Sequence, residues 1–186
     1  YLKYAYGRCG EKGLVGFGLG DWAPVGKKSA EFNAPLVLTD SLMIMDMARK
    51  AYEMFNAAGY AEYADFAYNI FKKMKSAIRT ELVDNDTLET VGNSQSGQAM
   101  AIYYGLFEEN EREKSFAHLL RYIRENDNNF DCGFLGINVI FHVLSDFGCG
   151  ELAFHMITKK EYPSYGHLIE KGETTLVESF QPDGKG

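Results

Sequence analysis

The sequence has 186 residues, enough for one domain with a sizeable core, and its 46% share of hydrophobic residues is that of an ordinary globular protein. The formal net charge is -7 and the basic residues are scattered along the chain, which excludes nucleic acid as an expected partner. No apolar run approaches the ~20 residues that span a membrane, so we expect no membrane partner. Because the chain begins at Tyr1, without an initiator methionine or a signal peptide, we expect a fragment of a longer protein.

Cysteine and charge patterns give no sign of a metal or cofactor. Cys9, Cys132 and Cys149 are an odd number without metal-ligand spacing, so we expect free thiols. The charged run from Glu108 to Lys114 is typical of a solvated helix start rather than a metal site. We therefore predict that the chain uses neither metal nor cofactor. Its 12 tyrosines suit either a helical core or a sugar-stacking surface, and composition leaves both open.

The first 38 residues are dense in glycine, at positions 7, 10, 13, 16, 18, 20 and 26, so no regular helix is predicted there. Within this stretch, Gly18–Pro24 places the only tryptophan, Trp22, directly after Asp21. The tryptophan could bury a loop against the helical body, or it could face a ligand. Both interpretations remain open on the residues alone.

Helical spacing of apolar residues then predicts six helices in chain order. Their expected ranges are 40–58, with Thr39 or Asp40 as the cap, about 60–82, 94–104, 111–126, 136–147 and 150–158, with a polar loop over 84–92. The helices that begin near 40, 94 and 136 are apolar on most sides, whereas their successors are amphipathic. We therefore predict an all-α domain of three antiparallel hairpins, the pattern of half an (α/α)6 barrel, with no sheet between residues 40 and 158.

The C-terminal part, after residue 158, differs in its sequence pattern from the six predicted helices. Two short apolar and β-branched runs, 165–169 and 174–177, flank the glycine-containing segment 170–173, a pattern that predicts a β-hairpin. Glu178 would then follow the second strand. A carboxylate held at a strand end can act as a general base, although most glutamates are solvated surface residues.

Several motifs together resemble the catalytic domain of bacterial α-L-rhamnosidases. The segment Tyr162–Phe180 resembles the family's Y-P-S-W-G-Y-M-I-x-x-G-A-T-T-x-W-E-x-W, and the Gly-Asp-Trp of residues 20–22 is a second family motif. Further matches are Asn93–Ala101 to T-Q-T-x-x-A-L-A-L, Cys132–Gly136 to T-G-F-L-G, and Phe147–Ala153 to Y-G-x-x-D-L-A. These stretches cover residues 16–180, so the resemblance implies that residues 1–186 are a single domain, a fragment of a larger (α/α)6 catalytic domain.

The resemblance implies an inverting glycoside hydrolase that releases terminal α-L-rhamnose from glycosides or polysaccharides, with Glu178 as general base. It also implies that Asp21, Trp22 and Tyr165 bind the carbohydrate substrate. The family's acidic D-G-x-x-R-E-E-like motif, which supplies the general acid, has no counterpart before Asp21. The remainder of the same polypeptide is therefore the expected partner, and the fragment is expected to be inactive alone.

Departures from the family pattern keep alternatives open. Val177, Phe180 and Tyr165 stand at family tryptophan positions, Glu173 replaces alanine and Ile137 replaces threonine. One alternative is another six-hairpin glycosidase or lyase, with Asp21 as the candidate carboxylate. Another is a non-catalytic carbohydrate-binding helical domain, which would account for Val177 and the missing acid. A D-G-x-x-R-E-E-like run in the longer reading frame would favour the enzyme.

Overall fold

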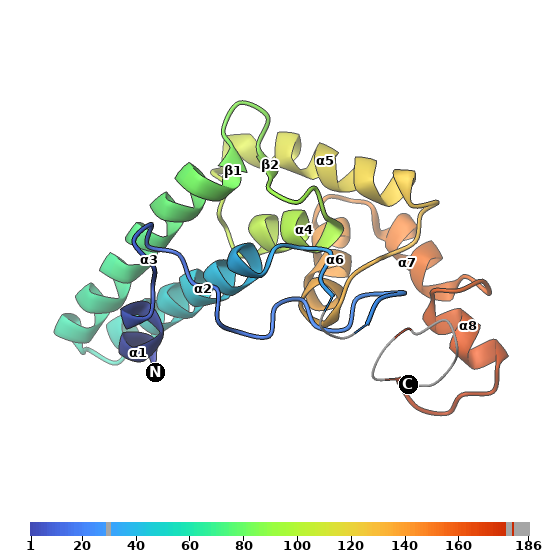
Figure 1. Ribbon diagram of the computed structural model, residues 1–186, viewed down its shortest axis with the longest axis horizontal. Coiled ribbons are helices and arrows are strands. Elements are labelled where there is room, and N and C mark those ends of the chain that lie inside the picture. Colours follow the sequence, from blue (N-terminus) through green and yellow to red (C-terminus); the bar gives the residue numbers. More distant parts are fainter. Residues whose placement is uncertain (29–30, 178–179, 181–186) are drawn as a thin grey trace.

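Three helical hairpins follow one another in a computed structural model that describes residues 1–28, 31–177 and 180 (Figure 1). The elements are α1 (Leu2–Gly7), α2 (Leu36–Ala57), α3 (Ala61–Leu82), β1 (Val83–Asp84), β2 (Glu89–Thr90), α4 (Gln95–Tyr103), the 3-10 helix η1 (Glu109–Glu111), α5 (Arg112–Glu125), α6 (Phe134–Asp146), α7 (Gly150–Thr158) and α8 (Tyr165–Glu170). The six helices expected between residues 40 and 158 are all present, which confirms the mainly helical fold.

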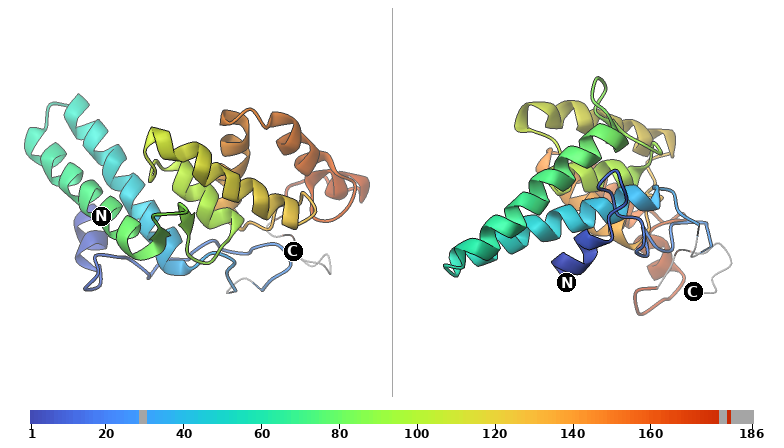
Figure 2. Two further views of the ribbon diagram at one scale, coloured as in Figure 1. Left: turned by 90° about the horizontal axis from the view of Figure 1, so that it is seen from above. Right: turned by 60° about the vertical axis from the view of Figure 1, so that its left-hand side comes forward.

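The hairpins pair α2 with α3, α4 with α5, and α6 with α7, and α4 also packs against α6 and α2 (Figures 1 and 2). Helices α2, α4 and α6 therefore form an inner row, with α3, α5 and α7 outside it. Every residue from Gln95 to Ile102 of α4 is buried, whereas only Ala153 and Met156 are buried in α7. In each hairpin the first helix has more buried residues than its partner: nine in α2 and six in α3, eight in α4 and five in α5, and five in α6 and two in α7, as predicted.

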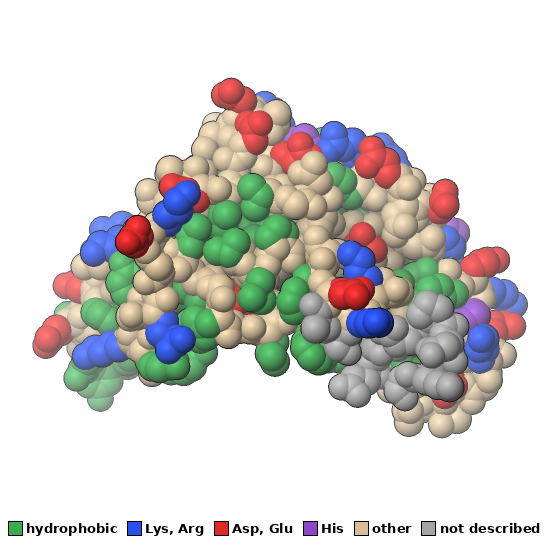
Figure 3. Space-filling view, viewed as in Figure 1, with side chains coloured by type: hydrophobic (Ala, Val, Ile, Leu, Met, Phe, Trp, Pro, Cys, Tyr) green, Lys and Arg blue, Asp and Glu red, His purple; other side chains and the backbone are tan. Residues whose placement is uncertain are grey.

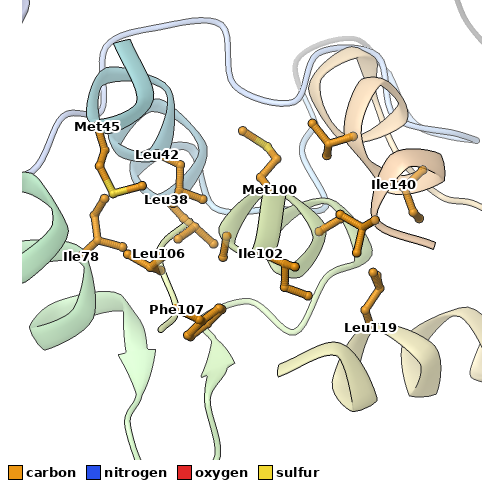
Figure 4. Packing of buried hydrophobic residues seen from close by; sticks show 14 of the residues in the cluster. Leu38, Leu42, Met45, Ile78, Met100, Ile102, Leu106, Phe107, Leu119 and Ile140 are labelled. Carbon is orange, nitrogen blue, oxygen red and sulfur yellow. The ribbon is translucent and has the colours of Figure 1, made fainter. Parts of the chain in front are cut away.

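The core lies between the two rows. Figure 4 shows Leu38 and Leu42 of α2 facing Met100 of α4, with Leu119 of α5 and Ile140 of α6 on the far side. All five side chains are almost completely buried. On the face shown in Figure 3, charged side chains follow the upper edge over α3, the β1–β2 turn and α5, while hydrophobic ones gather around α2. No described helix is both long enough and apolar enough to cross a membrane.

Two predictions near the N-terminus were wrong: the absence of a helix from the first 38 residues, and the start of the first long helix. A short helix, α1, forms before the glycine-dense segment begins at Gly7. Helix α2 starts at Leu36 after Pro35, whose φ of -57° already suits a helix entry. Thr39 and Asp40 are therefore buried inside the helix, and the Asp40 carboxylate accepts the backbone N–H of Gly18 (2.6 Å) rather than capping its own helix.

The prediction of no sheet between residues 40 and 158 was also wrong. Strands β1 and β2 pair antiparallel, with Val83 opposite Thr90 and Asp84 opposite Glu89. The Asp84 carboxylate closes the turn by accepting the N–H groups of Asp86 and Thr87 (2.9 and 3.0 Å). The segment predicted as a polar loop thus satisfies its backbone by local pairing.

The predicted C-terminal β-hairpin is not found in the described residues. Its first arm is helix α8, which Ser164 caps by accepting the His167 N–H at 2.9 Å, and residues 173–177 contain no strand. A short apolar run does not distinguish helix from strand by itself, and the capping serine decided the outcome. The remaining part of the second arm, 178–179, lies outside the described residues.

Candidate functional site

The segment Gly18–Ala23 lies against the N-terminal ends of α4 and α6, and Asp21 fixes it there. The Asp21 carboxylate is fully buried; one oxygen accepts the Ser96 hydroxyl and the N–H of Gly133 (2.8 Å), and the other accepts the N–H of Gly136 (2.8 Å). Gly133 is the N-cap residue of α6 and has no capping side chain of its own. Asp21 therefore caps α6 from a distant segment, with its negative charge at the favourable end of the helix dipole.

Two glycines make this close approach possible. A Cβ atom at Gly133 would lie 2.3 Å from the Trp22 carbonyl oxygen, and one at Gly136 would lie 2.2 Å from Ser96 Oγ. These contacts are too short for any other residue without backbone movement. The Gly-Phe-Leu-Gly part of the Cys132–Gly136 motif thus has a packing reason: it admits the Asp21 segment to the start of α6.

Trp22 is held through its backbone while its side chain stays partly exposed. Its carbonyl oxygen accepts the N–H of Phe134 at 2.9 Å. The next residue, Ala23, has a φ of 55°, a left-handed conformation that costs a non-glycine residue about 1 kcal/mol or more. Surrounding contacts therefore impose the course of the chain around Trp22.

Tyr165, the first residue of α8, belongs to an aromatic cluster beside this segment. Its half-buried ring lies edge-on to Phe180 (centroids 5.3 Å apart) and tilted to Phe130 (6.2 Å). A small cavity of about 40 Å³ lies here, lined by Ala23, Cys132, Gly133, Phe134, Ile137, Tyr165, Val177 and Phe180. Tertiary structure therefore brings Tyr165 and Ala23, the residue after Trp22, to one cavity, although 142 positions separate them in sequence.

The C-terminal segment is anchored at Phe180. This residue is buried, and its carbonyl oxygen accepts the N–H of Gly26 (3.1 Å) and the hydroxyl of Tyr162 (2.5 Å). Glu178, predicted from the sequence as general base, lies outside the described residues. Its described neighbours Val177 and Phe180 both line the small cavity.

Asp131 is a partly buried acid that was not predicted from the sequence. One of its carboxylate oxygens, Oδ1, is buried without a hydrogen-bond partner. Burial, and then the nearby Asp21 carboxylate, raise the pKa of Asp131 to about 6. Its position directly before the Cys132–Gly136 motif was the one available signal, but nothing local shows that its carboxyl group is removed from water. Among the described residues, no group of three or more His, Cys, Asp or Glu side chains could hold a metal ion.

Of the four site residues predicted, three can be located. Asp21 is fully buried and bonded to protein groups, Trp22 is partly exposed on the same segment, and Tyr165 lies across the small cavity. The contact of these three residues with substrate stays a prediction. The role of Glu178 stays one as well.

Comparison with known proteins places this geometry in a family. The model of the bacterial alpha-L-rhamnosidase six-hairpin glycosidase domain matches residues 1–185. An α-L-rhamnosidase of Streptomyces avermitilis is 31% identical over 140 residues, which is 74% of this chain and 13% of that protein. One from Formosa agariphila is 28% identical over 116 residues, covering 62% of this chain and 12% of the relative. The chain thus spans about an eighth of these relatives.

Solved structures agree. The Streptomyces avermitilis α-L-rhamnosidase complexed with L-rhamnose superposes with a TM-score of 0.84 and 26% identity, covering 98% of this chain and 17% of that one. The α-L-rhamnosidase from Dictyoglumus thermophilum gives a TM-score of 0.88 at 24% identity, covering 97% and 21%. The latter match concerns the fold alone.

Proposed function

The chain belongs to the bacterial α-L-rhamnosidase six-hairpin glycosidase domain family, and we propose that it is part of an inverting glycoside hydrolase that releases terminal α-L-rhamnose from glycosides or polysaccharides. The observation that carries this proposal is the match of the family model to residues 1–185, which includes the whole region around Trp22 and Tyr165. The substrate is accordingly a carbohydrate.

The remainder of the same polypeptide is the proposed partner that completes the site. An inverting mechanism needs two carboxyl groups about 6.5–9.5 Å apart, and no general-acid motif of the family precedes Asp21. The surface supports such a partner, because Tyr1, Tyr4 and Leu19 are each more than half exposed, Tyr1 and Leu19 line one cavity, and the Tyr4 ring lies 6.3 Å from that of Tyr1. Exposed apolar side chains gathered in this way mark a surface that another part of a protein covers.

In the proposed reaction, Glu178 takes a proton from a water molecule as that water's oxygen attacks the anomeric carbon. The bond from that carbon to the glycosidic oxygen breaks, and a general acid outside this chain protonates the leaving oxygen. Attack from the face opposite the leaving group inverts the configuration. Two features support Glu178 as the base: its place in the matched T-T-x-x-E segment, and the anchoring of Phe180 two residues later by Gly26 and Tyr162.

Trp22 and Tyr165 are the proposed contacts for the apolar face of the sugar ring, since aromatic side chains stack on C–H groups. Asp21 supports substrate binding by fixing the backbone next to Trp22. Its carboxylate oxygens already accept the Ser96 hydroxyl and two backbone N–H groups. In this proposal Trp22 and Tyr165 contact the sugar, and Asp21 holds Trp22 in place.

The test is Glu178→Gln in the polypeptide that contains the whole domain. Glutamine keeps the shape of glutamate but cannot accept the proton, so kcat on an aryl α-L-rhamnoside should fall by about 10²–10⁴ with little change in KM. Azide should restore part of the turnover, because an anionic nucleophile needs no base. The first product of the wild-type reaction, followed by NMR, should have the inverted configuration.

Glu170→Gln and Glu173→Gln are matched controls, because both side chains are exposed; each should leave kcat close to that of the wild type. Near wild-type kcat in Glu178→Gln would reject Glu178 as the base. Binding of rhamnosides without turnover by the intact protein would reject the hydrolase and favour a non-catalytic carbohydrate-binding domain.

A further inference from the structure

Asp40 is a buried acid of α2 that faces the backbone of the glycine-rich segment. Its carboxylate accepts the Gly18 N–H at 2.6 Å, and the backbone of Phe17 and Gly20 lies beside it. The residue is only 7% exposed. Burial raises the pKa of this carboxyl, and the backbone of Gly18, Gly20 and Phe17 counteracts that rise.

The glycines of this segment are required by the contact. A Cβ atom at Gly18 would lie 2.7 Å from Asp40 Oδ1, so only glycine lets the carboxylate reach the chain. Gly20 has a φ of 64°, and a Cβ atom there would lie 2.8 Å from Leu36 Cδ1. The backbone before Asp21 is therefore shaped around the Asp40 side chain.

The apolar surroundings of Asp40 indicate that it contributes little net stability to the fold. It lines a cavity of about 320 Å³ whose other side chains are Tyr1, Val15, Phe17, Leu19, Met43, Ile44, Met47 and Leu135. A carboxylate in such an apolar place loses hydration, and this cost offsets much of what its hydrogen bonds contribute to stability. A carboxylate can, however, orient several backbone N–H groups at once, because it is a charged acceptor with two oxygens.

We propose that Asp40 is a positioning residue of the glycosidase site: it fixes the segment before Asp21 to α2, so that two buried carboxylates, Asp40 and Asp21, tie the backbone next to Trp22 to all three hairpins. Asp21 joins the segment to α4 and α6, and Asp40 joins it to α2. Neither carboxylate needs to touch the substrate. This inference rests on the proposed function for its effect on activity, but the restraint on Trp22 is measurable without it.

The experiment uses Trp22 as a reporter, because it is the only tryptophan of the chain. Asp40→Asn keeps the size of the side chain but leaves one acceptor oxygen, and Gly18→Ala breaks the same contact from the other side. Asp46→Asn is the matched control: Asp46 is equally buried on the same helix, but it pairs with Arg49 and Lys50 (2.6 Å each) away from the segment. Circular dichroism establishes that each variant is folded.

In this chain, acrylamide should quench Trp22 fluorescence about twofold more strongly in Asp40→Asn and in Gly18→Ala than in the wild type, and Asp46→Asn should match the wild type. In the intact protein, Asp40→Asn should raise KM for an aryl α-L-rhamnoside about tenfold with a smaller change in kcat. Asp46→Asn should leave both constants unchanged.

Unchanged quenching in folded Asp40→Asn and Gly18→Ala would overturn the proposal, even if both variants were less stable. An equal loss of activity in Asp46→Asn would overturn it too, because the effect would then follow stability alone. If the quenching changes as expected but the intact wild type cleaves no rhamnoside, the restraint by Asp40 stands and the proposed function fails.

Discussion

Asp21→Asn should destabilise the fold by about 2–3 kcal/mol. The carboxylate accepts the Gly133 N–H on one oxygen and the Gly136 N–H on the other. An asparagine has a single carbonyl oxygen, so its NH₂ group must face one of these two buried donors. An unsatisfied buried N–H costs about 1–3 kcal/mol, and the lost charge at the start of α6 adds about 0.3–1 kcal/mol, while relief from burying a charge offsets part of the total.

Urea and thermal unfolding followed by circular dichroism measure this change. For a domain of this size, the expected loss corresponds to a fall in Tm of about 4–12 °C. Asp146→Asn is the control, because Asp146 is exposed and is the last residue of the same helix. Its charge lies at the unfavourable end of the dipole, so its removal should change stability by less than about 0.5 kcal/mol.

The reasoning about Asp21 would be refuted if Asp21→Asn stayed within about 0.5 kcal/mol of the wild type. It would also be refuted if Asp146→Asn lost as much stability, because the effect would then not depend on the end of α6. Ser96→Ala, which removes the third donor, should cost less than Asp21→Asn, since it leaves both backbone bonds to the carboxylate intact.

Three further predictions concern other parts of the chain. The pKa of Asp131 is raised from 3.8 to about 6, so the folded state holds this proton more tightly than the unfolded chain and loses stability as pH rises from about 4 through 6. Asp131→Asn should therefore gain about 1–3 kcal/mol over the wild type at pH 8 and little at pH 4 in urea unfolding, and a gain independent of pH would contradict this. Gln98→Leu should cost about 2–4 kcal/mol in the same assay, because buried Gln98 binds the Thr90 N–H, the Leu88 carbonyl and the Ser115 hydroxyl (2.9, 2.9 and 2.7 Å); a loss below 1 kcal/mol would show that water replaces these bonds. The 186-residue chain alone should hydrolyse an aryl α-L-rhamnoside at least about 10²-fold more slowly than the intact protein, and equal rates would place the general acid within this chain.

Local patterns were sufficient for the helical part of the fold. Apolar residues three and four positions apart lie on one helix face, so the six helices between residues 40 and 158 and the greater burial of the first helix in each hairpin could be predicted from neighbours in sequence. The family motifs likewise identified the family that the comparison confirms. Both signals are contained in short stretches of residues.

Short segments with balanced preferences could not be predicted in this way. The run from Tyr165 suits a strand as well as a helix, and the cap at Ser164 and packing against Phe180 made it α8. The β1–β2 pairing depended on a turn closed by Asp84 and on Gln98 reaching across from α4. In each case specific hydrogen bonds and packing, rather than the pattern of apolar residues, decided the conformation.

The arrangement of the candidate site could be predicted from the sequence even less than the short segments. On the residues alone the role of Trp22 stayed open, and the resemblance of Gly20–Trp22 to a family motif singled out Asp21 and Trp22. Only the tertiary structure showed that Asp21 caps α6, since its partners Ser96, Gly133 and Gly136 lie 75 to 115 positions further along the chain. The desolvation of the Asp40 and Asp131 carboxyl groups is equally invisible in sequence, because it depends on atoms that the folded chain brings from elsewhere. Sequence thus determined the six helices of the three hairpins, and the fold determined which carboxyl groups are removed from water and which segments they hold in place.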